Sequence, residues 1–408
     1  MKILKYSPKQ QTLMQWANRT DYRGIICDGS VRSGKTVCMI ISFVWWAMMN
    51  FNESNFGICG KTVRSAERNI IQVLLTISNV TGYFDVKYSR SINAVVISRG
   101  DKRNVFYVFG GRDESSYMLI QGITLSGVMF DEVALMPQSF VEQAIARTLS
   151  VKGSKLWFNC NPESPQHYFY TEWVQKAEEK NMLHLHFMMK DNPILTERQI
   201  KDAEELYQGV FYERYILGRW VVAEGLIYSS YNAEKEAVKP ELRHYSRYKI
   251  SVDYGTLNAT SMGLWGHADD GIWYRIDEYY YSGRTTNKQL TDEEYYTELE
   301  KLAGDRVVDK VIVDPSAASF ITCIKKHGKF RVAHASNAVL DGIRLTAVQL
   351  QKGTIKIQSN CADIIREFGL YRWDEKSAED KPIKDNDHAM DDMRYFVMDT
   401  FRTSSVRF

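Results

Sequence analysis

The first half of the chain carries short, largely apolar runs separated by longer helix-like segments. Such runs stand at Gly24–Cys27, Gly127–Phe130 and Lys155–Phe158. Residues Val37–Met49, VCMIISFVWWAMM, are apolar almost throughout. Short apolar runs are typical of strands buried on both faces, and a longer apolar segment suits a helix packed beneath a sheet. This half therefore predicts a mainly parallel sheet flanked by helices.

The second half follows a different order, in which three strand-like segments come first. They are Lys249–Asp253, Ala259–Trp265 and Gly271–Tyr281. The last two are close enough to form a hairpin. A helix-like run over 292–302 then leads to the apolar strand Val308–Asp314, and a last helix is expected over about 387–401. Three strands followed by strand–helix alternation and an acidic closing helix is the order of a ribonuclease H-like α/β fold.

A change of composition separates the two patterns. Residues Ala223–Lys239 are mostly small and polar, which is typical of a connecting segment. A chain of 408 residues is also long for a single core. We therefore predict two domains, 1–224 and 246–408, joined by a linker at 225–245.

Residues 29–36 read GSVRSGKT and match the phosphate-binding loop GxxxxGK[ST] in full. The glycines of this motif let backbone N–H groups turn inward onto phosphate oxygens. Lys35 would reach the terminal phosphates, and the Thr36 hydroxyl would ligate Mg²⁺. The strand before the loop and the helix after it support the match. The predicted nucleotide-binding residues here are Gly29, Ser30, Val31, Arg32, Ser33, Gly34, Lys35 and Thr36.

Two later strand ends supply further candidates for the same site. Asp131 and Glu132 follow the run GVMF, where the aspartate would hold Mg²⁺ through its water shell and the glutamate would polarise the attacking water. Asn161 follows the run KLWF within the sequence NCNP. Its amide would sense the γ-phosphate, and a plain Asn-Pro turn is the alternative.

Gln10 lies upstream of the loop, in the sequence YSPKQ. A carboxamide there would read the edge of adenine. Ser7 as N-cap, Pro8 at the first helical position and Gln10 three residues after Ser7 also make a helix capping box. The two interpretations are compatible.

Several arginines could act on phosphate. Arg32 sits inside the loop and is the first candidate for an arginine finger supplied in cis, with Arg112 and Arg147 as rivals. Arg64 and Arg68 stand at helical spacing. They would touch a DNA backbone or simply form a solvated helix face.

Composition excludes some classes of protein. Hydrophobic content of 44% and charged content of 25% are globular values. A net charge of +2 gives no overall sign of a nucleic-acid partner, so a DNA-binding surface would have to be a local patch. The six cysteines form no CxxC pair and are expected to be reduced thiols. No secretory signal or membrane span is expected.

Three aspartates form the second candidate site. Asp253 and Asp314 end strands, and Asp391 lies on the last helix. Mg²⁺ and Mn²⁺ prefer oxygen ligands, and two such ions can clamp the attacking and leaving oxygens of a phosphodiester. His388 shares a helix face with Asp391, where it would ligate metal or carry a proton. Successive helix residues point about 100° apart, so Asp392 is not expected to face the same metals.

These motifs resemble those of the large terminase subunits of tailed bacteriophages, over nearly the whole chain. The likeness rests on GSVRSGKT, VMFDE, NCNP, KDNPIL, GRWVVAEGLIY, SVDYGT, VIVDPSAAS and the C-terminal DNDHAMDDMRY. The resemblance implies nuclease metal ligands at Asp253, Asp314 and Asp391, with His388 beside them. Asp392 stands where many members have a small residue.

The resemblance implies an N-terminal P-loop ATPase domain and a C-terminal nuclease domain. ATP hydrolysis, with Mg²⁺, would move double-stranded DNA into a procapsid, and a nuclease with two divalent metals (Mg²⁺ or Mn²⁺) would cut concatemeric DNA. Expected partners are DNA, a small terminase subunit and the portal protein. We expect copies of this chain to form a ring when they are docked on the procapsid. The chain in solution could be a monomer. The expected location is the host cytoplasm and, transiently, the procapsid portal, but not the mature virion.

Two other functions compete with this one. A helicase-nuclease of repair or recombination would need further nucleotide-binding motifs in a second motor domain, and residues 231–408 contain none. A non-enzymatic ATP-binding adaptor is disfavoured by Lys35, Asp131 and Glu132. An ATPase assay separates that adaptor from a motor.

Overall fold

The computed structural model describes residues 6–19, 21–207, 209–241, 243–256, 258–375, 377 and 380–402. The chain divides into two compact units. The N-terminal unit comprises Met1–Glu205 and Val210–Val222, and the C-terminal unit comprises Leu206–Gly209 and Ala223–Phe408. The stretch 225–245 packs within the C-terminal unit, where the backbone N–H of Ile227 donates to Tyr371 and that of Val238 donates to Ile357.

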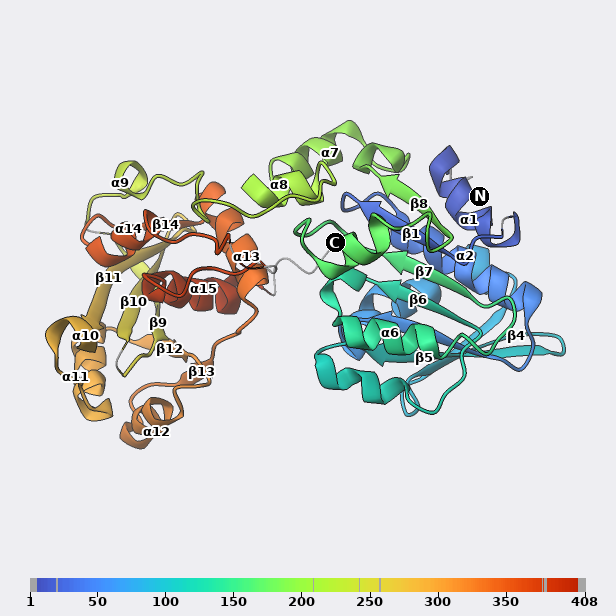
Figure 1. The fold of residues 1–408 in the computed structure, drawn as a ribbon. Helices are drawn as coiled ribbons and strands as arrows, with labels where there is room; N and C mark the ends of the chain where they lie inside the picture. The colour runs from blue at the N-terminus through green and yellow to red at the C-terminus, as the bar shows by residue number, and fades with distance from the viewer. Residues whose placement is uncertain are drawn as a thin grey trace. The chain divides into compact units, whose positions relative to one another are not determined.

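An eight-stranded sheet forms the N-terminal unit, in the order β3-β4-β5-β2-β6-β7-β1-β8 (Figure 1). The strands are β1 (Gly24–Gly29), β2 (Asn55–Gly60), β3 (Asp85–Ser89), β4 (Ala94–Arg99), β5 (Lys102–Gly110), β6 (Gly127–Asp131), β7 (Lys155–Asn159) and β8 (Met182–Phe187). All pairs are parallel except β3–β4 and β4–β5 at one edge. The expected mainly parallel sheet is therefore confirmed.

Helices cover both faces of this sheet. The longer ones are α1 (Pro8–Arg19), α2 (Lys35–Asn50) and α6 (Gln138–Ala146). The short helical segments of the N-terminal half are α3 (Val63–Ala66), η1 (Glu67–Ile71), α4 (Gln72–Leu74), α5 (Ser78–Thr81), η2 (Glu114–Ile120), η3 (Val133–Leu135), η4 (Tyr170–Val174), η5 (Met189–Asp191), α7 (Glu197–Glu204) and α8 (Gly209–Tyr215). Helices α1 and α2 share one apolar core, and α6 belongs to another.

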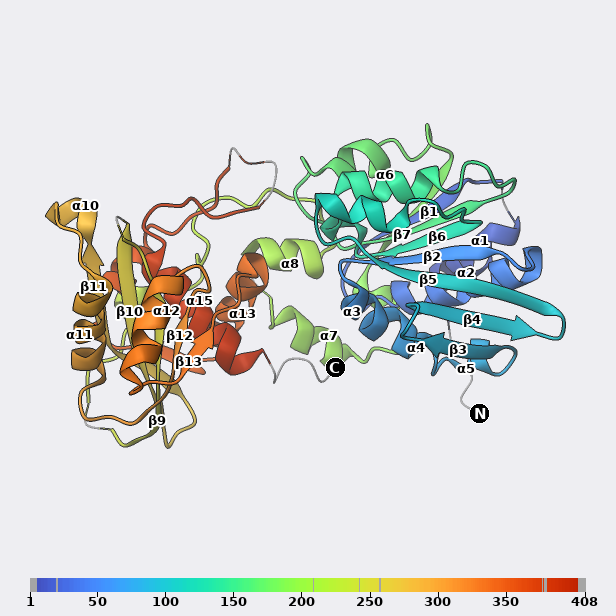
Figure 2. The ribbon, with the colours of Figure 1, turned by 90° about the horizontal axis from the view of Figure 1, so that it is seen from below.

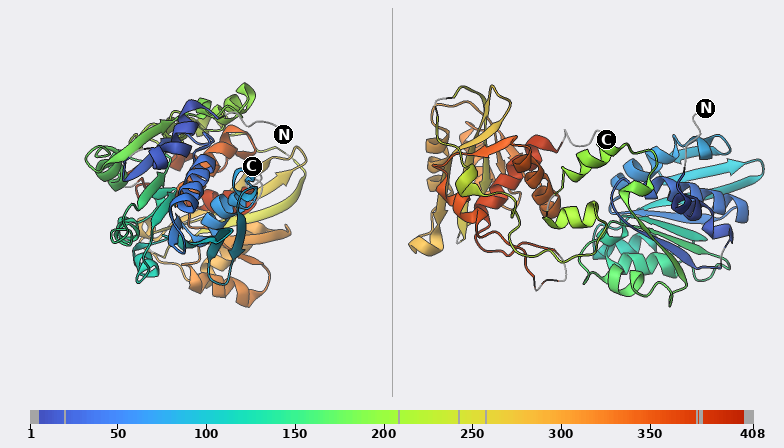
Figure 3. Two further views of the ribbon diagram at one scale, coloured as in Figure 1. Left: turned by 90° about the vertical axis from the view of Figure 1, so that its right-hand side faces the viewer. Right: turned by 90° about the horizontal axis from the view of Figure 1, so that it is seen from above.

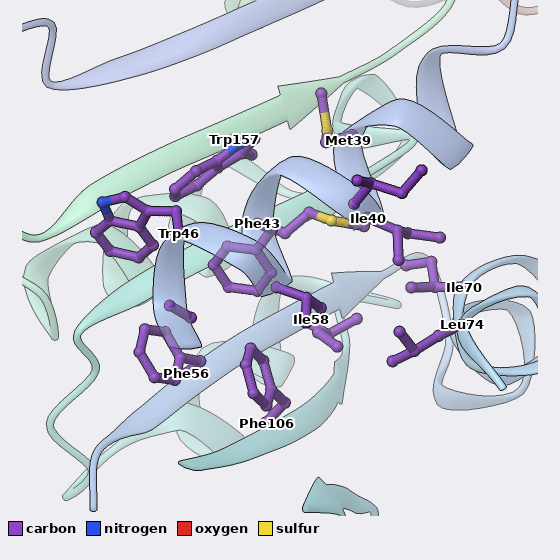
Figure 4. Packing of buried hydrophobic residues seen from close by; sticks show 14 of the residues in the cluster. Met39, Ile40, Phe43, Trp46, Phe56, Ile58, Ile70, Leu74, Phe106 and Trp157 are labelled. Atoms are coloured by element: carbon purple, nitrogen blue, oxygen red, sulfur yellow. The ribbon is translucent and has the colours of Figure 1, made fainter. Parts of the chain in front are cut away.

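The apolar helix α2 is the centre of the first core. Figure 4 shows Phe43 and Trp46 of α2 packed toward Trp157 of the sheet, with both ring centroids 4.9 Å from that of Trp157. Truncating a buried ring of this kind costs about 3–5 kcal/mol. This packing holds the N-terminal end of α2, where the phosphate loop ends, firmly on the sheet.

A six-stranded sheet forms the C-terminal unit, in the order β13-β12-β9-β10-β11-β14. The strands are β9 (Tyr245–Asp253), β10 (Ala259–Ala268), β11 (Trp273–Ser282), β12 (Val308–Val313), β13 (Val332–His334) and β14 (Ile355–Ile357). Strands β9, β10 and β11 are antiparallel, while β12 and β13 continue the sheet in parallel. This arrangement confirms the ribonuclease H-like fold.

The helices of the C-terminal unit are α9 (Ala233–Glu236), α10 (Gly283–Thr286), α11 (Asp292–Ala303), α12 (Ala318–His327), α13 (Val339–Gln351), α14 (Ala362–Phe368) and α15 (His388–Phe401). Figures 2 and 3 show α11 and the red α15 on opposite sides of the yellow strands. Ile250 and Val252 of β9 belong to the core with α11 and α12. Ser251 and Asp253 alternate with them and contact α15. In the described residues, no helix combines the length and apolar character needed to cross a membrane.

Candidate functional sites

The phosphate loop connects β1 to α2 in a conformation that requires glycine. Gly29 has φ +119° and Gly34 has φ +86°, both in the region that side chains disfavour. A Cβ on Gly29 would also collide with the Phe187 carbonyl. The loop therefore turns tightly at its glycines, and backbone N–H groups can reach a bound phosphate.

Lys35 is buried beneath the loop. Its Nζ donates to the carbonyl oxygens of Ser30 at 2.7 Å and Gly29 at 3.1 Å. It also donates to Ser33 Oγ and Asn161 Oδ1, each at 3.3 Å. Burial lowers the pKa of Lys35 to about 8. A nearby phosphate would favour the charged form again, because opposite charge raises the pKa of an amine.

Thr36 and Asp131 meet at the strand ends as the sequence predicts. Thr36 Oγ1 donates to Asp131 Oδ1 at 3.3 Å. Asn159, at the end of β7, donates from Nδ2 to Asp131 Oδ1 at 2.5 Å and to Thr36 Oγ1 at 2.9 Å. Burial raises the pKa of Asp131. Sequence reasoning favours Asn161 in this motif and misses Asn159, although Asn159 is the strand-end residue of β7.

Glu132 directly follows β6 in the left-handed region, with φ +57°. Non-glycine residues are uncommon in that region, and they cluster at functional sites. Asn161 lies next to the lysine rather than at the Thr36–Asp131 pair. Asn161 therefore borders the phosphate loop, and the role of Glu132 as the residue that polarises the attacking water stays a prediction.

The structure confirms the capping box at Gln10. Its Oε1 accepts from the Ser7 N–H at 3.1 Å, and Ser7 Oγ accepts from the Gln10 N–H at 3.3 Å. Gln10 Nε2 also donates to the Ser33 carbonyl at 3.1 Å, so this side chain ties α1 to the phosphate loop. Recognition of adenine by Gln10 stays a prediction.

The arginine candidates differ in position. Arg32 is exposed on the loop with φ +57°, and its carbonyl accepts from Asn192 Nδ2 at 2.8 Å. Arg112 is exposed and Arg147 is half-buried. The choice of finger stays with Arg32 as a prediction. Arg64 and Arg68 are both exposed. Exposure is compatible with a contact to the DNA backbone and equally with a solvated helix face.

In the C-terminal unit, the three predicted carboxylates lie around one tyrosine and one histidine. Tyr395 Oη donates to Asp314 Oδ2 at 2.8 Å and to Asp253 Oδ1 at 3.4 Å. His388 Nδ1 lies 2.8 Å from Asp253 Oδ2. Asp391 lies one helical turn beyond His388. All of these side chains line one cavity of about 700 Å³. We call Asp253, Asp314 and Asp391 the acidic cluster.

Two basic side chains, Arg394 and Lys384, contact Asp391 of the acidic cluster. Arg394 donates from Nε to Asp391 Oδ1 at 3.2 Å. Lys384 Nζ lies 3.2 Å from Asp391 Oδ2 and 3.0 Å from Asp387 Oδ2. Each oxygen of the Asp391 carboxylate therefore has a basic partner, which fixes its orientation.

The protonation of the acidic cluster reflects its burial. Burial, together with the charge of Asp391, raises the pKa of Asp253 to about 6. Burial alone would lower the pKa of His388, but the hydrogen bond and charge of Asp253 outweigh it and the net pKa is raised. Asp314 is less enclosed, and hydrogen bonds from Ser316 keep its pKa below the usual value. His388 and Asp253 therefore form a hydrogen-bonded pair at the cavity wall, and the pKa of each is raised.

Asp392 lies on a different face of α15 from Asp391. It is fully buried, and its oxygens accept from Arg275 Nη1 at 2.5 Å and Nη2 at 3.0 Å. The hydroxyls of Ser251 and Ser261 donate to it as well. Every one of these partners stabilises a carboxylate that is turned away from the acidic cluster.

Some residues of the cavity carry no signal in the sequence. Lys384 precedes the last helix in a polar stretch, and Arg366 lies on α14 with no motif around it. Their proximity to the acidic cluster depends on long-range packing, which residue spacing does not reveal.

Comparison with known proteins identifies the family. The family model for the terminase large subunit, T4-like-virus type, N-terminal, matches residues 26–234. The large terminase of a thermophilic bacteriophage is 49% identical, with a TM-score of 0.92 over 97% of this chain and 99% of that one. The ADP complex of that terminase is 48% identical, with a TM-score of 0.91 over 97% of this chain and 100% of that one. Its ATP-γ-S complex is 48% identical, with a TM-score of 0.89 over 97% of this chain and 99% of that one.

A comparison with curated protein sequences gave no match. The family model covers half of the chain, and the structures of the thermophilic-phage terminase cover both of its units. The chain belongs to the family of bacteriophage terminase large subunits.

Proposed function

We propose that this chain hydrolyses ATP to move double-stranded DNA into a procapsid and cuts concatemeric DNA with a metal-dependent nuclease. The observation that carries the proposal is the presence of two built sites on one chain. Lys35, Thr36 and Asp131 converge at the phosphate loop, and the acidic cluster lines a cavity in the other unit. The thermophilic-phage large terminase has been solved with ADP and with ATP-γ-S, which supports a nucleotide at the loop.

In the ATPase site, Lys35 would pair with the terminal phosphates, and Thr36 with Asp131 would hold Mg²⁺. Glu132 would orient the attacking water, and Arg32 would stabilise charge that develops on the γ-phosphate. Asn159 would keep Thr36 and Asp131 in place, since its amide already donates to both.

In the nuclease site, the donor set fits hard divalent cations. Asp253, Asp314 and Asp391 bring carboxylate oxygens to one cavity, and Mg²⁺ or Mn²⁺ prefers such ligands. When bound, two divalent metals would supply an activated water and stabilise the leaving oxygen. His388 would hold a proton beside Asp253. Lys384 and Arg366 line the cavity and would bind the DNA backbone through its phosphates.

The remaining partners follow from the family rather than from the geometry. We propose that the chain works with a small terminase subunit and a portal protein, as a ring on the procapsid, in the host cytoplasm. The rival function, a repair or recombination helicase-nuclease, needs a second motor domain. The described part of the C-terminal unit has the ribonuclease H-like strand order instead.

Reciprocal variants test the proposal. Lys35→Ala should lose ATP hydrolysis and keep plasmid cleavage in Mn²⁺, whereas Asp253→Asn should lose cleavage and keep hydrolysis. Circular dichroism of both variants controls for folding. Loss of cleavage in folded Lys35→Ala protein would overturn the independence of the two sites.

A further inference from the structure

Helix α15 carries His388 and Asp391 but lacks a cap of its own. Asp387, at the N-cap position, makes no side-chain capping bond. The first N–H groups of a helix have no partner within the helix and need one elsewhere. Here Glu367 Oε2 accepts from the Ala389 N–H at 2.7 Å and from the Met390 N–H at 3.3 Å. The cap of α15 therefore comes from a different helix, α14.

Glu367 is itself fixed on its other side. Its side chain is fully buried, and its Oε1 accepts from Tyr280 Oη at 2.7 Å. A buried carboxylate at a helix N-terminus interacts favourably with the partial positive charge of the N–H groups there. The two capped amides lie between His388 and Asp391 in sequence, so the cap acts on the turn that carries both residues.

Buried charged side chains make further contacts among the same elements. Glu278 accepts from the Asp363 N–H at 2.6 Å at the start of α14, and Arg275 donates to Glu278 and to Asp392 of α15. Strand β11, α14 and α15 are thus joined by buried polar contacts in addition to the cap. A fully satisfied buried network of this kind specifies one arrangement of its elements.

We infer that Glu367 is a positioning residue of the nuclease site, which sets the place of His388 and Asp391 in the acidic cluster by capping α15. The inference rests on the proposed nuclease function. Glu367 touches neither metal nor DNA in this role. Removing it should alter the geometry of the acidic cluster, which the affinity for metal reports.

The test compares Glu367→Ala with Glu367→Gln and Thr291→Ala in the full chain. Thr291 caps α11 in the same unit, and α11 carries no residue of the acidic cluster, so this variant removes a cap without touching α15. Three quantities are measured: amide hydrogen exchange over 388–391, Mn²⁺ binding by paramagnetic resonance, and the Mn²⁺ concentration for half-maximal plasmid cleavage.

Glu367→Ala should speed exchange of the Ala389 and Met390 amides and weaken Mn²⁺ binding on the order of tenfold or more, as expected for a residue behind the ligands. Glu367→Gln keeps an oxygen acceptor and should bind Mn²⁺ close to the wild type. A tenfold loss of Mn²⁺ binding in this variant would overturn the inference, even if Glu367→Ala fails to fold. Thr291→Ala should leave Mn²⁺ binding unchanged. Wild-type exchange and Mn²⁺ binding in Glu367→Ala, or an equal loss of binding in Thr291→Ala, would overturn the inference. A wild-type chain that neither binds Mn²⁺ nor cleaves DNA would overturn the proposed nuclease, while the exchange data would still report on the cap.

Discussion

Neighbouring aspartates on α15 should respond oppositely to the same substitution. Asp391→Asn should abolish cleavage at a smaller cost in stability than Asp392→Asn. Asp391 lines an open cavity, its loss relieves repulsion with Asp253, and Arg394 keeps the Ser336 carbonyl as a partner. Asp392→Asn should destabilise the C-terminal unit, because Arg275 and Asp392 are both fully buried and form a two-point ion pair.

The size of the Asp392 effect follows from that burial. Breaking a buried ion pair by removing one partner costs about 3–5 kcal/mol. Glu278 still faces Arg275 in the variant, which places the cost near the lower end, at about 3 kcal/mol. For a unit of this size, each kcal/mol lowers the melting temperature by about 2–4 °C, so a fall of about 6–12 °C is expected.

The assay is differential scanning calorimetry of both variants, with plasmid cleavage in Mn²⁺ measured well below either melting temperature. Asp392→Asn should then cut DNA and Asp391→Asn should not. The assignment of the two faces of α15 would be refuted by two results together. These are an Asp392→Asn protein with the wild-type melting temperature that fails to cut DNA, and an Asp391→Asn protein that cuts it.

Further outcomes concern both units. Asn159→Ala should raise the Mg²⁺ concentration for half-maximal ATP hydrolysis on the order of tenfold, because Asn159 donates to Thr36 and Asp131, the two proposed Mg²⁺ ligands; an unchanged Mg²⁺ dependence would contradict this. Arg32→Ala should lower the turnover of ATP far more than nucleotide affinity, on the order of a thousandfold for an arginine finger, and near-normal turnover would move that role to Arg112 or Arg147. In EDTA, the melting temperature of the C-terminal unit should fall as pH rises from about 5 to about 8, since folded-state protons are lost there. The reason is that burial raises the pKa of Asp253 to about 6 and that of Glu367 to about 7, so the folded chain still holds protons that the unfolded chain has released. Melting temperatures that climb over this range would show the sign to be wrong.

Local patterns predict the strands and the motifs well. The apolar runs before Gly29 and Asp131 form the buried strands β1 and β6, because strand burial depends on residues close in sequence. The hairpin β10–β11 and the helix α15 also lie where the pattern places them.

What the pattern misses depends on contacts between distant elements. Asn159 reaches Thr36 across 123 positions, and Tyr280 meets Glu367 across 87. The stretch 225–245 resembles a plain connector by composition, but its backbone bonds to residues beyond 350. The three carboxylates of the acidic cluster repel one another, and no pattern in the sequence indicates which cations lie beside them. The pairing of Asp391 with Arg394 and Lys384 offsets that repulsion.

The most direct test of the central proposal is plasmid cleavage by the purified full-length chain in Mn²⁺, Mg²⁺ or EDTA, beside its Asp253→Asn variant. We expect nicked and linear DNA from the wild type in Mn²⁺ or Mg²⁺, and intact plasmid from the wild type in EDTA and from the variant in every buffer. Cleavage that persists in EDTA, or in Asp253→Asn protein with Mn²⁺, would contradict a metal-dependent nuclease at the acidic cluster.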